Sequence, residues 1–172
     1  VYWTYDNGDA IGRANLDGGD VNTSFLTGVD TPRGIGQSAD HLYWSTYVGG
    51  QIGRAGFDGT FPNLAFITGG SAPGSVVTDG TYLYWSNLGA NTIGRSNLDG
   101  TGVNQSFITG ATGAFGLAID SQYIYFSNVA SKIGRVRLDG TGLNVDFMAG
   151  LPSPNGLAVN ADHIFWASNT VD

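Results

Sequence analysis

The residues of this sequence that could do chemistry are few in kind. All fourteen acidic residues are Asp, and the chain has seven Lys or Arg, two His and no Cys. A metal site would therefore need Asp, Asn and backbone carbonyl oxygens, which are ligands that suit Ca²⁺. "DNGD" (Asp6–Asp9) and "DGGD" (Asp17–Asp20) offer such oxygens. Asp, Asn and Gly are equally the residues of tight turns, so we expect no cofactor, with Ca²⁺ as the weaker alternative.

Glycine-rich corners and arginines form a second group. "DGTG" and the "IGR" glycines resemble phosphate-binding loops, which need a helix N-terminus behind them, and no helical pattern follows any of them. Asp-Gly between two strands instead predicts a hairpin turn. We expect each "IGR" arginine to pack on the neighbouring aromatic pair and donate to a carbonyl or an Asp. A ring around an anion is the alternative for these residues, which are Arg13, Arg54, Arg95 and Arg135.

The two histidines share one position in the pattern. His41 and His163 each lie three residues before a Trp, where other copies have Tyr82 and Tyr123. A residue that exchanges with Tyr fills an aromatic position, so neither is expected to be a base or a metal ligand. We assign no catalytic residue.

All of these residues belong to one unit that recurs along the chain. The aromatic pairs start at Tyr2, Tyr43, Tyr84, Tyr125 and Phe165, at intervals of 41, 41, 41 and 40 residues. Their second members are Trp3, Trp44, Trp85, Phe126 and Trp166. The Asp-Gly turns recur at Asp17, Asp58, Asp99 and Asp139, each followed by Asn and then by a Phe. We expect these repeated residues to be structural.

Each unit contains four short runs of strand length. In residues 74–110 the runs "GSVVTDG", "YLYWSN", "TIGRSNL" and "NQSFITG" are separated by turn residues, and no window has a helical period. Four antiparallel strands repeated every ~40–45 residues are typical of a β-propeller. The sequence therefore predicts an all-β fold of propeller blades.

The motif "LYWS…IGR..LDG......FITG" resembles the YWTD repeat of low-density-lipoprotein-receptor-type propellers, in a bacterial-like form, over the whole chain. The resemblance implies a first, innermost strand at segments such as "GLAID", the aromatic pair on the second strand and "IGR" on the third. The chain departs from the family at the YWTD aspartate, where Thr4, Ser45, Ser86, Ser127 and Ala167 follow the pairs. Any interlock made by that aspartate must come here from hydroxyls and amides, or be absent.

The strand order implied by the resemblance divides the chain into units at about 1–33 (partial), 34–73, 74–115, 116–150 and 151–172 (partial). This division predicts seventeen strands, one more than a closed four-bladed ring needs. The related propellers have six blades. We expect part of a larger propeller, with an array that self-associates through open edges as the alternative.

Charge limits the partners. The net charge is −7, and four of the seven cations lie in the repeated motif, so no nucleic-acid partner is expected. No apolar run approaches the ~20 residues that cross a bilayer, so no membrane insertion is expected. We expect an extracellular or periplasmic location, although the lack of Cys leaves the compartment undecided.

Variation among the copies is confined to some loops. In a four-stranded meander, the loops from strand one to two and from three to four share one end, here called the uniform face. The loops from strand two to three and from strand four to the next sheet share the other end, here called the diverse face, and differ between copies. We predict that ligands meet the diverse face, although neutral drift would give the same pattern. Its candidate residues are Tyr5, Asp6, Asp9, Arg33, Tyr47, Phe115 and Lys132.

The function expected from these features is a non-catalytic binding or scaffold module for a protein, peptide or glycan. One alternative is a metal-dependent propeller lyase or lactonase-type enzyme, whose site would draw on further blades. We incline against it, because no unrepeated His or acidic pair lies on the first strands. A structural array or filament unit is the other alternative.

Overall fold

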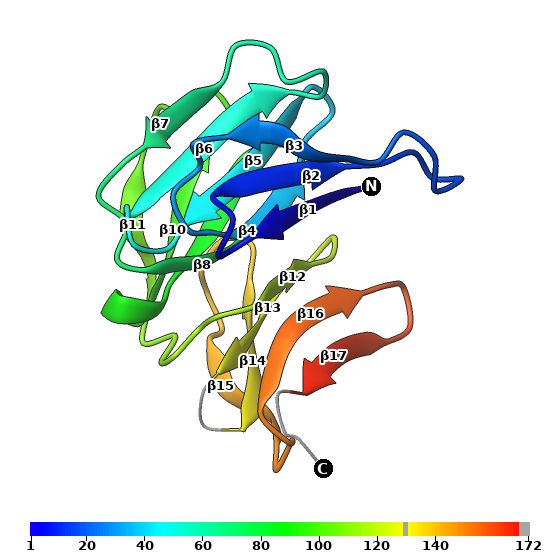
Figure 1. Cartoon of the computed structure of the whole chain (residues 1–172). Helices are drawn as coiled ribbons and strands as arrows, with labels where there is room; N and C mark the ends of the chain where they lie inside the picture. The colour runs from blue at the N-terminus through cyan, green and yellow to red at the C-terminus, as the bar shows by residue number, and fades with distance from the viewer. Residues whose placement is uncertain (129–130, 169–172) are drawn as a thin grey trace.

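The computed structural model describes residues 1–128 and 131–168, which contain seventeen strands and one 3₁₀ turn. Two residues of the loop 127–132 and the last four residues of the unit 151–172 lie outside the described residues. The strands form five antiparallel sheets, which follow one another around the inner strands β4, β8, β12 and β16 (Figure 1).

Three of the five sheets contain four strands in sequence order. The second sheet consists of β4 (Pro32–Gln37), β5 (His41–Thr46), β6 (Gln51–Gly56) and β7 (Asn63–Ile67). The third consists of β8 (Pro73–Thr78), β9 (Tyr82–Asn87), β10 (Thr92–Asn97) and β11 (Asn104–Thr109), with the 3₁₀ turn at Leu88–Ala90. The fourth consists of β12 (Leu117–Ile119), β13 (Tyr123–Asn128), β14 (Lys132–Arg137) and β15 (Asn144–Ala149).

The first and last sheets contain fewer strands. The first has β1 (Tyr2–Tyr5), β2 (Ala10–Arg13) and β3 (Asn22–Thr27), which correspond to the second, third and fourth strands of the complete sheets. The fifth has β16 (Pro154–Val159) and β17 (Ile164–Ser168), which correspond to the first and second strands. The prediction of an all-β fold with blades of four antiparallel strands, and of seventeen strands in this order, is confirmed.

The core lies between neighbouring sheets, because the second strand of each complete sheet is buried on both faces. Trp44 packs with Ile11 and Leu26 of the first sheet, whereas Tyr43 packs with Val76 and Leu83 of the third. The same alternation sends Trp85 toward the second sheet and Tyr84 toward the fourth. Successive side chains of a strand point to opposite faces, so one strand contributes to two cores.

A close approach of the third strand completes this packing. In the sheet register Trp44 is paired with Gly53 and Trp85 with Gly94. A Cβ atom built on either glycine would overlap the indole ring. The glycine of "IGR" is therefore required because the ring lies directly over the backbone, and no phosphate needs to be invoked.

Side-chain hydroxyls tie each sheet to the next. Ser45 Oγ accepts the N–H of Gly34 in its own sheet at 2.8 Å and donates to the carbonyl of Gly74 in the third sheet at 3.0 Å. The same position donates to the next sheet at Thr4 (to Arg33 O), Ser86 (to Phe115 O) and Ser127 (to Asn155 O). Hydroxyls thus make the interlock that the YWTD comparison left open. In β17 the position is Ala167, which has no hydroxyl.

Among the described residues, no helix is long and apolar enough to span a bilayer.

Candidate functional site

The two sets of loops that define the diverse face lie side by side. The N–H of Val29, between the first and second sheets, donates to the carbonyl of Asp9 in the loop between β1 and β2 at 3.0 Å. The N–H of Gly70 donates in the same way to the carbonyl of Gly50 at 2.8 Å. Loops from strand two to three and loops between sheets therefore form one continuous surface.

A strained residue organises this surface where the first two sheets meet. Thr31 has φ of 43°, a left-handed conformation that is rare for a β-branched residue. Asp9 Oδ1 accepts its N–H at 3.2 Å, and its carbonyl accepts the N–H of Tyr47 at 3.1 Å. Its Oγ1 accepts the N–H of Val48 at 3.2 Å. Three loops are thereby held together, and strain of this kind is more frequent at functional sites than elsewhere.

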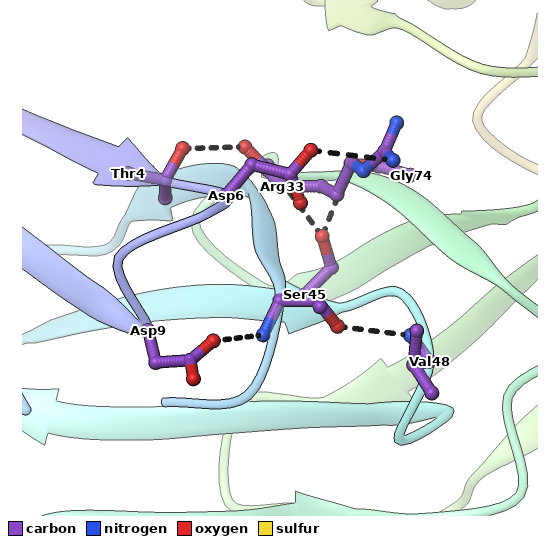
Figure 2. A network of polar contacts seen from close by, with 9 residues as sticks. Thr4, Asp6, Asp9, Arg33, Ser45, Val48 and Gly74 are labelled. Carbon is purple, nitrogen blue, oxygen red and sulfur yellow. Dashed lines mark hydrogen bonds and ion pairs between the residues drawn. The ribbon is translucent and has the colours of Figure 1, made fainter. Parts of the chain in front are cut away.

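Beside this clamp lies a group of three side chains, here called the Arg33 cluster: Asp6, Arg33 and Tyr47. Figure 2 shows the ion pair of this cluster between Asp6 and Arg33. Arg33 Nη2 lies 3.3 Å from Asp6 Oδ2, and the guanidinium carbon lies 4.4 Å from the centroid of the Tyr47 ring. The carbonyl of Arg33 also accepts the hydroxyl of Thr4 at 2.8 Å. The guanidinium is therefore fixed between a carboxylate of the first sheet and a ring of the second.

The Arg33 cluster remains accessible to solvent. The side chains of Arg33 and Asp6 are 34% and 46% exposed, so their ion pair contributes little to folding stability. The Arg33 cluster offers a binding partner hydrogen-bond donors, acceptors and an aromatic face that are already fixed in place. Arg and Tyr are the residue types that most often carry binding energy at protein interfaces.

The other predicted residues of the diverse face are not all part of this cluster. Asp9 is adjacent but is used by the Thr31 clamp. The ring of Tyr5 meets Trp3 edge-on, with centroids 6.1 Å apart. Phe115 is half-buried in the loop before β12, and Lys132 at the start of β14 pairs with Asp146 at 2.6 Å. The structure therefore brings Asp6, Arg33 and Tyr47 together and leaves Phe115 and Lys132 in other sheets.

Thr31 is the residue of this site that the sequence analysis missed. A signal for it exists, because Thr31-Pro32, Ala72-Pro73 and Ser153-Pro154 occupy the same position in three units. In each case the residue before the proline has a positive φ. A residue before proline is normally extended, so the pattern does not by itself disclose a left-handed residue.

The "IGR" arginines lie on aromatic rings, but not on those of the pair. Arg54 lies 4.1 Å from the Phe66 ring centroid, and Arg95 lies 3.8 Å from that of Phe107. Arg13 and Arg135 lie in the same way on Phe25 and Phe147, both on the fourth strand of their sheets. Arg54 Nη1 also donates to the carbonyl of Leu98 at 3.3 Å. The arginines are held separately, one in each of the first four sheets.

The repeated Asp-Gly turns are closed by their own side chains. Asp99 Oδ1 accepts the N–H of Thr101 at 2.8 Å and its hydroxyl at 2.7 Å, and Asp58 and Asp139 make the same contacts with Thr60 and Thr141. The hydroxyl and then the N–H of this threonine hold the pKa of each carboxyl below its usual value. In Asp17 the carboxylate accepts the N–H of Gly19.

Both histidines occupy the aromatic position predicted for them. His41 lies 6.2 Å from the Tyr43 ring and His163 lies 6.0 Å from the Phe165 ring. Tyr82 lies at a similar distance, 6.4 Å, from Tyr84.

Grooves also occur on the uniform face. One of about 600 Å³ lies between the fourth and fifth sheets and is lined by residues that include Asp120, Tyr123 and Asn160. Burial alone would raise the pKa of Asp120, but the N–H groups of Gln122 and Tyr123 and the Tyr125 hydroxyl outweigh it, so the pKa is lowered. Burial and this carboxylate raise the pKa of the Tyr125 hydroxyl. The carboxylate is thus committed to the turn that contains it.

Within residues 1–128 and 131–168, no three His, Cys, Asp or Glu side chains lie close enough to hold a metal ion together.

The fold is shared with solved β-propellers. A structure of a nidogen–laminin complex contains a chain that superposes with a TM-score of 0.87 at 23% identity, covering 97% of this chain and 66% of that one. Virginiamycin B lyase from Staphylococcus aureus gives a TM-score of 0.75 at 20% identity, covering 97% and 59%. A gluconolactonase from Xanthomonas campestris gives a TM-score of 0.76 at 18% identity, covering 98% and 66%.

The chain spans less than two thirds of the length of each of these solved propellers. No protein-family model matches the sequence, and no curated protein matches it. The chain is therefore a β-propeller by fold, and the similarity extends across nearly all of it.

Proposed function

We propose that this chain is a binding module of the YWTD type that presents its diverse face to a protein or peptide partner. The observation that carries the proposal is the Arg33 cluster: an exposed arginine that is fixed by a carboxylate and stacked on a tyrosine, beside a strained loop clamp. The loops of this face differ between units while the uniform face is repeated. The nidogen chain, which has the highest of the quoted TM-scores, was solved in a complex with another protein.

The physical case rests on preorganisation. Binding loses less conformational entropy when donors and rings are already fixed in the free protein. Asp6 and Tyr47 hold the Arg33 guanidinium and Thr4 holds its backbone carbonyl, so the side chain can meet a partner without reordering the loop. A partner that supplies a carboxylate or carbonyl and a flat apolar group would match this surface.

Selection from a displayed peptide library and from a glycan array tests the proposal. Ligands selected on the unmodified chain should lose about tenfold or more in affinity for the double variant Arg33→Ala/Tyr47→Ala, as expected when central interface residues are truncated. Gln122→Ala, an exposed change on the uniform face, is the matched control and should leave binding unchanged. Selected ligands that bind the double variant as well as the unmodified chain would contradict the proposal.

A metal-dependent lyase or lactonase-type activity is the second candidate. The observation in its favour is that two of the solved propellers with this fold are a lyase and a gluconolactonase. The melting temperature with added Ca²⁺ or Mg²⁺, measured beside lactone hydrolysis, tests this candidate. A rise in melting temperature together with hydrolysis would support the enzyme over the binding module. The absence of both effects would count against the enzyme.

An extracellular or periplasmic location fits a binding module of this type, and we propose it together with the function. A role as a unit of an array or filament is the remaining candidate, and sedimentation velocity would detect the assembly that it requires.

A further inference from the structure

The second strand of the fifth sheet exposes an aromatic pair that the three complete sheets bury. Phe165 is 54% exposed and Trp166 is 37% exposed. Their counterparts in the third sheet, Tyr84 and Trp85, are both fully buried. Among the described residues, β17 pairs with β16 alone, so its outer backbone edge is open to a further strand. This open edge and the two rings are here called the β17 edge.

The strand register in the other sheets indicates which sequence a strand needs in order to pair with this edge. Opposite the second aromatic residue lies a glycine in every sheet that has a third strand: Trp3–Gly12, Trp44–Gly53, Trp85–Gly94 and Phe126–Gly134. A Cβ atom at any of these glycines would overlap the ring. A strand that pairs with β17 must therefore place Gly opposite Trp166.

The first aromatic residue imposes a second requirement. In the same four sheets the residue opposite it is an arginine, as in Tyr84–Arg95. That arginine lies on a phenylalanine twelve residues further along, and the Phe107 ring lies 6.1 Å from Tyr84. Phe165 would be covered in the same way by a hairpin whose first strand carries Arg and whose second carries Phe.

We propose that the β17 edge is a docking site for a β-hairpin with the sequence Ile-Gly-Arg in its first strand and Phe twelve residues after the Arg. The hairpin binds by strand addition: main-chain hydrogen bonds supply affinity, and the glycine opposite Trp166 supplies selectivity. This surface is separate from the diverse face, and it concerns a different partner from the one in the proposed function. The occupant is thus a hairpin of the same pattern as β10–β11.

A synthetic peptide of residues 91–110, added to the whole chain, tests the proposal. Trp44 and Trp85 are fully buried and Trp3 is partly buried in the first sheet, so the Trp166→Phe variant is needed to assign a fluorescence change to Trp166. We expect a blue shift that saturates with peptide, together with a calorimetric binding signal. In the Trp166→Phe variant the shift should disappear while calorimetric binding persists, because Phe126 fills the same position in β13.

The matched control peptide carries Gly94→Val, which keeps strand propensity but adds a side chain against the indole. We expect its affinity to fall by about tenfold or more, the usual effect of overpacking. Equal binding of the two peptides, or no binding of either, would overturn the proposal. Concentration-dependent dimers that bury Trp166 without peptide would also overturn it, because the occupant would then be a second copy of the chain.

Discussion

Trp44 and Trp85 occupy the same position in successive sheets, but only one of the two indoles has a hydrogen-bond partner. Trp85 Nε1 donates to Gln105 Oε1 at 2.9 Å. The position of Gln105 is Leu64 in the second sheet, and Trp44 Nε1 is buried without a partner. A buried N–H that has lost its bond to water and gained none in return reduces stability.

The variant Leu64→Gln should therefore stabilise the chain by about 1 kcal/mol, since it supplies an acceptor for Trp44 Nε1. Leu64 is 41% exposed, so little apolar burial is lost. Urea unfolding followed by circular dichroism measures the change in free energy of unfolding. The reverse change, Gln105→Leu, should destabilise by about 2 kcal/mol because Gln105 also bonds Asn87 and Thr68. Destabilisation by Leu64→Gln would contradict this account.

Individual residues were predictable from the sequence where the repeat fixed their environment. The aromatic position of His41 beside Tyr43 follows from its place in the unit, whereas the contact of Gly94 with the Trp85 ring was found only in the structure. The partner of Arg33 did not follow, because Asp6 lies in another sheet and only the relative placement of two sheets brings them together. Nor did the role of Thr31, whose hydrogen bonds with Asp9, Tyr47 and Val48 come from two other loops.

Between elements, the serine hydroxyls replace the main-chain ladder that neighbouring sheets lack. Ser86 is fully buried, accepts the N–H of Ser75 at 2.9 Å and donates to the carbonyl of Phe115 at 2.7 Å. The N–H of Ser75 belongs to β8 of the same sheet, and the carbonyl of Phe115 belongs to the loop that leads into β12 of the next sheet. The hydroxyl satisfies both at once.

Ser86→Ala should reduce the free energy of unfolding by about 1–3 kcal/mol, because two partly buried backbone groups lose their partner. Ser106→Ala, an exposed change in the same sheet, is the control and should alter stability little. Chemical unfolding of the two variants in parallel measures the difference. Similar stabilities for both would show that the hydroxyl is not what joins the third and fourth sheets.

The Asp-Gly turns between the third and fourth strands make a contribution that depends on pH. The folded pKa of Asp58, Asp99 and Asp139 lies below the ordinary value of an aspartate carboxyl. Their contribution to stability is therefore present above that value and is lost as pH falls through the lowered folded pKa. Acid should weaken these turns while leaving the serine hydroxyls unaffected.

Thr101→Val tests this link, since it removes the hydroxyl that is the largest cause of the shift at Asp99. We expect the Asp99 pKa, followed by NMR titration, to rise toward its usual value, with Asp139 unchanged as the control inside the same molecule. The variant should also lose less stability than the unmodified chain when the pH is lowered. An unchanged Asp99 pKa would contradict the assignment.

At the scale of the whole molecule, the main contacts between sheets in the described residues join each sheet to the one before or after it. Stability in such an array is a sum of unit terms and terms between neighbours. The second, third and fourth sheets have neighbours on both sides, whereas most of β17 is exposed. Local opening should therefore be least costly at the fifth sheet.

Native-state hydrogen exchange should show this gradient. Amides of β9 and β10 are expected to exchange slowest and those of β17 fastest, because protection follows burial and cooperative packing. Mass spectrometry of peptic fragments, or NMR, measures both in one experiment. Equal protection of β9 and β17 would mean that the chain opens as a single cooperative unit.

The fold as a whole could be predicted because the period, the aromatic pairs and the turns agree in every copy. The four-stranded blade and its turns follow from these three signals, whereas the strand order came from the resemblance to the YWTD repeat. The hydrogen bonds that join neighbouring sheets could not be predicted. Nothing in the sequence shows that the hydroxyl after an aromatic pair bonds a carbonyl 29 residues away, as Ser45 does with Gly74. Contacts between units are set by geometry that a repeat pattern does not encode.

The division of each second strand between two cores has a consequence for how such a chain can change. Trp44 packs in the core between the first and second sheets, and Tyr43 packs in the core between the second and third sheets. Inserting one residue before the pair would turn each ring to the opposite face of the sheet. The indole would then meet a core that is shaped for a phenol, and the phenol a core that is shaped for an indole. Duplicating or deleting an entire unit would leave every junction with the same pair of surfaces. Evolution along this sequence should therefore proceed readily by whole units and be nearly closed to single-residue insertions in the second strands.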